Sequence, residues 1–314
     1  MLSVCLPGTG GMLPLPGRYL ACCLLEYQGK SVLIDCGEGT QMALRAAGCR
    51  ISRIERILIT HLHADHLAGL PGLLLTIGNT GRTEPLLLAG PPGLYQAASA
   101  LMQIAPVPYP VQVAELAEGG GLEGWAGLRI RSLPLKHGIP CYGYRCEIER
   151  KPVFNPQKAE RLGIPKEYYR RLHAGESVRL PDGRTVEPQA VLEGERPPLA
   201  VCYCTDTLPI PDIAGFAKGA DLFIAEGMYG GGDAGEAEKR KGKMHSTFPD
   251  SAWLAAQAGV RQLWLTHFSP ALADPQQELE AARALFPQSV AAFDGIRLTL
   301  GSRSEKAAGE KQAF

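Results

Sequence analysis

Three histidines and one aspartate are concentrated in the stretch Thr60-His61-Leu62-His63-Ala64-Asp65-His66. It follows an apolar, β-branched run at 54–59, which predicts a buried strand, and precedes residues 67–75, which predict a helix. Side chains two residues apart in an extended loop point the same way, so His61 and His63 can reach one ion. Asp65 and His66, at the turn into the helix, can reach a second ion. This donor set suits zinc, with manganese or iron as alternatives.

Other candidate ligands each follow a predicted strand: His137 follows 128–134, Asp206 follows 199–204 and His267 follows 262–266. A pair of neighbouring cations needs about seven protein ligands and a shared oxygen group. A carboxylate bridges two cations well, because it has two oxygens and one charge. The sequence therefore predicts a two-metal site with a bridging water, in which Asp206 is the bridge. The two expected ligand sets are His61, His63 and His137 for the first ion, and Asp65, His66 and His267 for the second.

The composition is that of a globular chain with a large core. It has 314 residues, of which 45% are hydrophobic, and its 32 basic residues equal its 32 acidic ones. A net charge of zero means that any nucleic-acid affinity must come from a local patch. Nine cysteines without a CxxC pair do not form a disulfide framework. We expect no signal peptide, no membrane span and a cytoplasmic location.

Strands and helices alternate along the chain, with hairpins near the start. This pattern predicts an α/β fold in which two mixed sheets pack together with helices outside. Gly119-Gly120-Gly121 predicts a loop. We also expect a glycine-rich charged loop at 229–242 and a frayed tail after Ser302. Asp35, at the end of a predicted strand, has two interpretations: it orients a ligating histidine, or it caps the helix that follows.

Residues 150–199 interrupt the regular pattern. The segment contains seven prolines and is too long for an ordinary connection. We predict a solvated insertion, or projecting arm, within one domain that covers residues 1–314. Lys166, Arg170 and Arg171 surround Tyr168 and Tyr169, and basic residues interleaved with aromatics can hold an RNA backbone. A plain charged surface loop is the alternative.

The ligand pattern resembles the metallo-β-lactamase superfamily, and within it the ribonuclease Z family, which trims the 3′ trailer of precursor transfer RNA. The resemblance runs over nearly the whole chain. Besides the ligands, its more specific elements are His245-Ser246-Thr247 between Asp206 and His267, and the arm after Tyr144. It implies an αββα four-layer sandwich, two Zn²⁺ per subunit, a homodimer, precursor tRNA as substrate and an arm that grips it.

The resemblance also implies catalytic roles. A metal-activated hydroxide would attack phosphorus, with Asp65 orienting it and taking its proton. His245, held by Glu226, would protonate the leaving 3′ oxygen. The alternative for His245 is a helix-entry residue without chemistry.

The chain departs from the family pattern in two places. The early loop reads Pro14-Leu15-Pro16-Gly17-Arg18-Tyr19, where the family often has Pro-x-Lys-x-Arg-Asn, so Arg18 is the expected substrate contact there. Residues 270–272 read Pro-Ala-Leu, where the family usually has an Arg-Tyr pair. Both changes affect substrate contacts and spare the metal ligands. Two other functions therefore remain open: a dizinc hydrolase of small phosphodiesters or other esters, and an inactive scaffold that binds RNA or protein.

Overall fold

The computed structural model describes residues 1–125, 127–231 and 244–301. The loop expected at 229–242 lies mostly outside the described residues, and the tail expected after Ser302 lies wholly outside them. The chain divides into two compact units, one made of Met1–Cys146 with Ala200–Phe314, the other of Glu147–Leu199.

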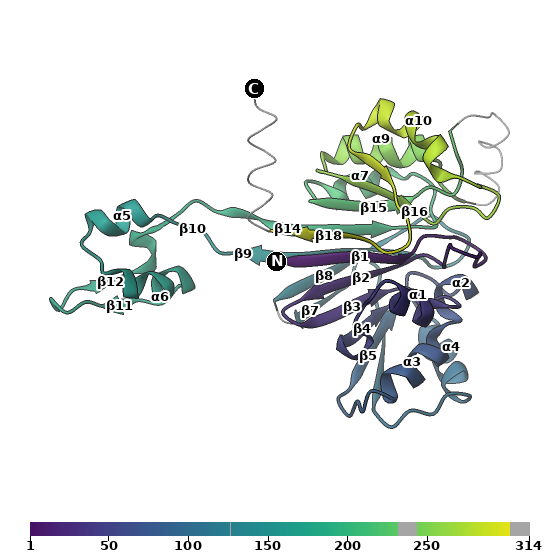
Figure 1. Ribbon diagram of the computed structural model, residues 1–314, viewed down its shortest axis with the longest axis horizontal. Coiled ribbons are helices and arrows are strands. Elements are labelled where there is room, and N and C mark those ends of the chain that lie inside the picture. The colour runs from purple at the N-terminus through teal and green to yellow at the C-terminus, as the bar shows by residue number, and fades with distance from the viewer. Residues whose placement is uncertain (126, 232–243, 302–314) are drawn as a thin grey trace. The chain divides into compact units, whose positions relative to one another are not determined.

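The first unit contains two seven-stranded mixed sheets, as the sequence predicts (Figure 1). The first sheet has the order β18 (Ile296–Leu300), β1 (Leu2–Gly8), β2 (Cys22–Tyr27), β3 (Lys30–Ile34), β4 (Ile54–Leu58), β5 (Leu86–Gly90) and β6 (Val111–Glu115). The second has the order β17 (Ser289–Ala291), β16 (Leu263–Thr266), β15 (Leu222–Glu226), β14 (Arg196–Cys204), β9 (Tyr142–Arg150), β8 (Leu128–Pro134) and β7 (Gly121–Trp125).

Helices cover the outer face of each sheet, which gives four layers (Figure 1). On the first sheet lie α1 (Thr40–Ala46), α2 (Ala64–Leu67), α3 (Leu70–Gly78) and α4 (Leu94–Met102), with a short 3₁₀ turn at Ile51–Arg53. On the second lie α7 (Pro211–Ala217), α9 (Phe248–Ala258) and α10 (Leu279–Leu285), which a 3₁₀ turn at Pro275–Glu278 precedes. The predicted αββα sandwich is confirmed.

The strands are apolar on both faces because both faces are covered. On β14, for example, Cys202 belongs to the core beneath the helices, whereas its neighbour Tyr203 points to the other face and is equally buried. The two sheets are also joined by hydrogen bonds: Tyr144 Oη on β9 donates to the Ile59 carbonyl at 2.6 Å, and the Tyr142 amide donates to the Thr60 carbonyl at 2.9 Å. These bonds fix the end of β4, where the histidine-rich stretch begins.

The sequence-based expectation differs from the structure in three local features. The region after Gly120 is not all loop, because β7 pairs with β8 there. The helix expected after the histidine stretch is two helices, α2 and α3, separated at Ala68 and Gly69. β14 begins at Arg196, earlier than expected.

The unit Glu147–Leu199 has its own small apolar core, which differs from the solvated insertion that the sequence predicts. Its elements are β10 (Val153–Phe154), α5 (Pro156–Arg161), η2 (Lys166–Tyr168), α6 (Tyr169–Ala174), β11 (Val178–Arg179), β12 (Thr185–Val186), η3 (Pro188–Ala190) and β13 (Leu192–Glu193). The buried side chains come singly from four of these elements and from the connections between them: Ala159, Ile164, Leu172, Val178, Leu180, Val186 and Val191. Such short elements give no measurable periodicity in the sequence.

Candidate metal centre

The predicted ligands all follow strand ends and lie together at one rim of the sandwich. Asp206 follows β14 and His267 follows β16, whose carboxyl ends meet because these strands run parallel to β15 between them. The stretch from His61 to His66 follows β4 and includes α2. His137 follows β8. The structure thus places all seven predicted ligands in overlapping groups whose ligand atoms lie within 4.8 Å of one another.

His61, His63 and His137 form the first group. His61 Nε2 lies 2.9 Å from His63 Nδ1, which lies 3.3 Å from His137 Nε2. Two nitrogens that bind one tetrahedral zinc lie about 3.3 Å apart. Burial lowers the pKa of His61 well below its ordinary value, and the neighbouring histidines lower it further. Both effects favour the neutral imidazole, which is the form that binds a metal.

Asp65, His66 and His267 form the second group. His66 Nε2 and His267 Nε2 lie 3.3 Å apart, and each lies 3.5 Å from Asp65 Oδ2. His66 and His267 are buried, and Asp65 is partly exposed. The group offers two imidazole nitrogens and one carboxylate oxygen to a common point.

Asp206 lies between the two groups. Its Oδ2 atom is 3.3 Å from His66 Nε2 and 3.4 Å from His267 Nε2, whereas Oδ1 is 3.9 Å from His61 Nε2. Oδ2 is buried and has no hydrogen-bond partner among the residues that the structure describes. An unpaired buried carboxylate oxygen is costly unless a cation satisfies it. These residues therefore fit a pair of metal ions, with one Asp206 oxygen toward each group.

Two further carboxylates lie behind the histidines of the second group. Asp35 Oδ2 lies 2.8 Å from His66 Nδ1, and Glu226 Oε1 lies 3.3 Å from His267 Nδ1. The hydrogen bond to Asp35 favours the tautomer of His66 in which Nε2 carries the lone pair that faces the metal. The Asp35 side chain does not cap α1, whose N-cap is Gly39. Of its two interpretations, the structure therefore favours histidine orientation.

Thr60 is a part of the site that the sequence reasoning missed. Its hydroxyl and amide both donate to Asp35, and Oγ1 lies 3.1 Å from His61 Nδ1. The same residue thus steadies one histidine directly and another through Asp35. A threonine beside the histidine stretch gives no distinctive signal in a single sequence.

Glu226 also holds His245. Its Oε1 lies 2.5 Å from His245 Nδ1, while Oε2 accepts the Ser246 amide at 2.6 Å. Thr247 caps α9 in a capping box with Asp250, which fixes the chain immediately after His245. Burial lowers the pKa of His245, but Glu226 and Asp206 outweigh it and raise the pKa above its ordinary value. Burial likewise opposes ionisation of Glu226, yet His245 and His267 lower its pKa to about 2.

The site concentrates unusual backbone conformations. Asp35, Asp206 and His267 have φ of 64°, 55° and 57°, a left-handed conformation that non-glycine residues rarely adopt. Met12 and Met244 also have a positive φ. Met244 directly precedes His245 in the chain, and the Met12 amide contacts Asp65. Close backbone packing supports these turns: a Cβ on Gly37 would lie 1.9 Å from the Asp65 carbonyl, and one on Gly69 would lie 1.9 Å from the Gly37 carbonyl. Such strain is typical of functional sites.

Arg18 is the expected substrate contact in the early loop. In the structure its guanidinium binds backbone carbonyls of the protein. Its guanidinium donates to the carbonyls of Leu272 at 2.8 Å, Ala273 at 3.0 Å and Ser269 at 3.4 Å, and lies over the Phe268 ring. The two departures from the family pattern therefore touch each other. Arg18 therefore has a structural role, and its guanidinium is engaged by the protein instead of being presented to a substrate.

The expected substrate residues of the inserted unit are exposed. Lys166, Arg170 and Arg171 lie on its surface, and Arg171 pairs with Glu176 at 3.1 Å. Tyr168 and Tyr169 instead pack against the small core of this unit, and Tyr169 lies against Phe154. Both tyrosines are therefore half-buried, so the interleaved pattern presents mainly its cations to solvent.

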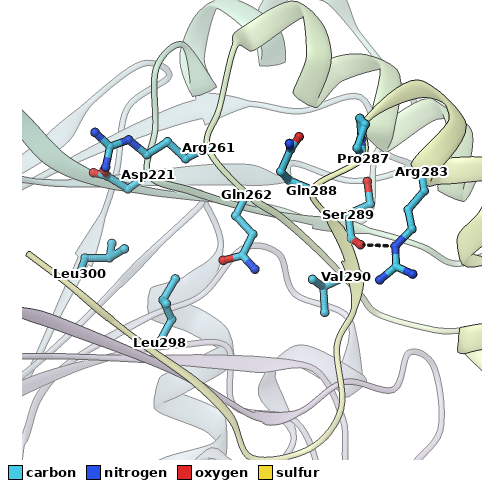
Figure 2. A pocket seen from close by; sticks show the side chains of 10 residues that line it. All are labelled: Asp221, Arg261, Gln262, Arg283, Pro287, Gln288, Ser289, Val290, Leu298 and Leu300. Atoms are coloured by element: carbon cyan, nitrogen blue, oxygen red, sulfur yellow. Dashed lines mark hydrogen bonds and ion pairs between the residues drawn. The ribbon is translucent and has the colours of Figure 1, made fainter. Parts of the chain in front are cut away.

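A separate pocket of about 500 Å³ lies away from these ligands (Figure 2). Asp221, Gln262 and Ser289, at the starts of β15, β16 and β17, line it together with Leu298 and Leu300 of β18. The ligand His267 follows the opposite end of β16, and Asp206 follows the same end of the parallel strand β14. The pocket is therefore not part of the candidate centre.

Comparisons with known proteins identify relatives over the full length. The chain is 46% identical to a ribonuclease Z of Lachnospira eligens over 96% of this chain and 98% of the relative. A family model described as anti-Pycsar protein Apyc1 matches residues 2–93. No helix among the described residues is both long and apolar enough to cross a membrane.

Solved structures show the same fold. The short form of human tRNase Z has a TM-score of 0.65 at 23% identity, covering 96% of this chain and 100% of that one. A metallo-β-lactamase fold protein from Bacillus subtilis has a TM-score of 0.67 at 18% identity, covering 95% and 98%. The expected metallo-β-lactamase fold is confirmed.

Proposed function

Because the chain belongs to the ribonuclease Z family, whose members are metal-dependent endoribonucleases, we propose that it removes the 3′ trailer of precursor tRNA. The observation that carries this proposal is the position of Asp206. One oxygen faces His66 and His267, and the other faces His61. A carboxylate shared in this way would hold two cations close together, which is the arrangement that two-metal hydrolysis of a phosphodiester uses.

We propose two Zn²⁺ per subunit, with Mn²⁺ or Fe²⁺ as alternatives. His61, His63 and His137 would hold one ion, Asp65, His66 and His267 the other, and Asp206 both. The bound cations would supply Lewis acidity, which lowers the pKa of a water and stabilises charge on the phosphoryl oxygens. The mixed imidazole and carboxylate donors favour zinc over magnesium or calcium.

Three side chains would move or hold protons. Asp65 orients the attacking water and takes its proton. His245 donates a proton to the leaving 3′ oxygen, and the contact of 2.5 Å with Glu226 keeps Nδ1 engaged so that Nε2 carries the transferable proton. Glu226 also faces His267 at 3.3 Å, so one buried carboxylate orients both an acid and a ligand.

The unit Glu147–Leu199 would bind the body of the tRNA. Lys166, Arg170 and Arg171 are exposed cations within a short stretch, which is the arrangement that contacts successive phosphates. The chain as a whole has no net charge, so this local patch would supply the attraction. We further propose a homodimer in the cytoplasm, where the nine free cysteines would stay reduced.

A parallel assay with two substrates tests the function. The metal-loaded protein is incubated with a precursor tRNA and with bis(p-nitrophenyl) phosphate. We expect a single cut that releases the trailer, and both activities should be lost in Asp206→Ala. Turnover of the small ester alone would overturn tRNA processing in favour of a small-phosphodiester hydrolase. Turnover of neither substrate would favour the scaffold function.

A further inference from the structure

Residues 9–19, called the 9–19 loop, form most of the connection from β1 to β2 and lie directly against the second ligand group. Gly11 leaves no room beside the His267 ring, because a Cβ there would lie 2.8–2.9 Å from three ring atoms. The Gly11 amide donates to the Phe268 carbonyl at 2.9 Å, and the Phe268 amide donates to the Thr9 carbonyl at 3.0 Å. Two backbone hydrogen bonds therefore join the 9–19 loop to Phe268, the residue that follows His267.

One hydrogen bond joins this loop to a proposed catalytic carboxylate. The Met12 amide donates to Asp65 Oδ2 at 2.8 Å. The same oxygen faces His66 Nε2 and His267 Nε2 at 3.5 Å each. Because a carboxylate can rotate about its last bond, a fixed donor on Oδ2 holds the group in the orientation that faces the histidines. The Met12 side chain is 46% exposed, so it is the backbone that points inward.

Met12 could not hold this position alone, since its φ of 65° costs energy for a residue with a Cβ. Two polar anchors secure the loop. Asp294 Oδ1 accepts the Thr9 hydroxyl at 2.8 Å and Oδ2 accepts the Tyr19 amide at 2.6 Å, which closes the base of the loop. The other anchor is Arg18, whose guanidinium grips the carbonyls of Leu272 and Ala273.

We propose that the 9–19 loop is a positioning element of the metal centre, in which Asp294 and Arg18 hold the loop and the Met12 amide fixes Asp65. The proposal rests on the proposed function only for the role of Asp65 as ligand and proton acceptor. It assigns to Asp294, which touches no ligand, an effect on the affinity for the second metal ion. Loss of a hydrogen-bond partner behind a ligand typically lowers metal affinity about 10–100-fold.

Two substitutions at Met12 separate the amide from the side chain. Met12→Pro removes the N–H and cannot adopt a positive φ, whereas Met12→Gly keeps the N–H and accepts that φ without strain. Apo protein is titrated with Co²⁺ against a competing chelator, and the visible absorption reports each binding step. We expect one of the two binding steps to lose affinity about tenfold or more in Met12→Pro and to be retained in Met12→Gly. Equal loss in both variants would show that the side chain matters, and would overturn the proposal.

Asp294 provides the second test, because Met12→Pro could unfold the loop. Asp294→Ala loses both anchoring bonds. In Asp294→Asn the amide oxygen can still accept from Tyr19 and the NH₂ group can donate to the Thr9 hydroxyl. We expect Asp294→Ala to weaken the same Co²⁺ step and Asp294→Asn to rescue it, with both variants folded by near-ultraviolet circular dichroism. Wild-type Co²⁺ affinity in Asp294→Ala would overturn the proposal. Since the readout is metal affinity, a failure of RNA cleavage by the wild type would count against the proposed function alone.

Discussion

His66 Nδ1 lies 2.8 Å from Asp35 Oδ2, and both side chains are buried. In Asp35→Asn the carboxamide oxygen would keep the Thr60 amide, so the NH₂ group would face His66 Nδ1 and drive the ring proton onto Nε2. Asn tolerates the left-handed backbone of this position. We expect metal affinity to fall about 10–100-fold. Isothermal titration of the apo protein with Zn²⁺ measures it.

The matched control for this change is Asp221→Asn. Asp221 is another buried carboxylate, which accepts the Ala200 amide at 2.9 Å but lies at the opposite end of β15 from Glu226. The Asp221→Asn variant should bind Zn²⁺ with the affinity of the wild type. Equal affinities in Asp35→Asn and the wild type would show that Asp35 serves the backbone of Thr60 and not His66.

The proposed role of His245 as a proton donor is tested with two substrates that differ in their leaving group. An RNA 3′ oxygen needs a proton when it departs, whereas p-nitrophenolate does not. We therefore expect His245→Ala to lower kcat for precursor tRNA about 10²–10⁴-fold and to leave bis(p-nitrophenyl) phosphate turnover within a few-fold of the wild type. Equal losses on both substrates would mean that His245 supports the fold or the metal instead.

The proposed role of the inserted unit in tRNA binding is tested through the salt dependence of the dissociation constant. A triple Lys166→Ala, Arg170→Ala, Arg171→Ala variant should bind precursor tRNA more weakly, and the slope of log Kd against log salt should flatten by about one for each lost phosphate contact. Small-ester turnover should not change. The control removes the exposed Arg45, Arg50 and Lys218 of the other unit. If both triple variants lose the same affinity, the attraction is not specific to the inserted unit.

Cys49 should be the most reactive thiol at neutral pH. The hydrogen bond between Cys49 and Cys5 and the nearby Arg297 outweigh burial and lower the pKa of Cys49 to about 7, whereas burial raises the pKa of Cys22, Cys23 and Cys36. The thiolate is the reactive form, so alkylation should increase as pH rises and level off above about 7.

Iodoacetamide labelling followed by peptide mass spectrometry gives the midpoint for Cys49. Arg297→Gln should raise it, since the guanidinium 3.2 Å from Cys49 Sγ stabilises the thiolate. A midpoint unchanged by this substitution would exclude the role of Arg297.

The sequence predicts what depends on local spacing. His61, His63, Asp65 and His66 lie within six residues, and His137, Asp206 and His267 each follow a strand whose apolar run is easily seen. Parallel strands bring their ends together, so convergence could be expected. The alternation of strands and helices is also a local pattern of the sequence, so the layered fold could be predicted from it.

Other features depend on tertiary contacts that leave no sequence signal. The core of the inserted unit draws on elements of two to six residues, too short for a period to appear. Arg18 seemed free for substrate because nothing in the sequence places it beside Leu272 and Ala273. The Met12 amide is backbone, and Asp294 follows it by more than 280 residues. Such positioning contacts become visible only once the chain is folded.

Cleavage of precursor tRNA during Zn²⁺ titration of the apo protein tests the central claim most directly. The account predicts that trailer release will rise to a plateau at two equivalents of Zn²⁺ per chain, because Asp206 must hold both ions. A plateau at one equivalent, or no RNA cleavage at any loading, would contradict it.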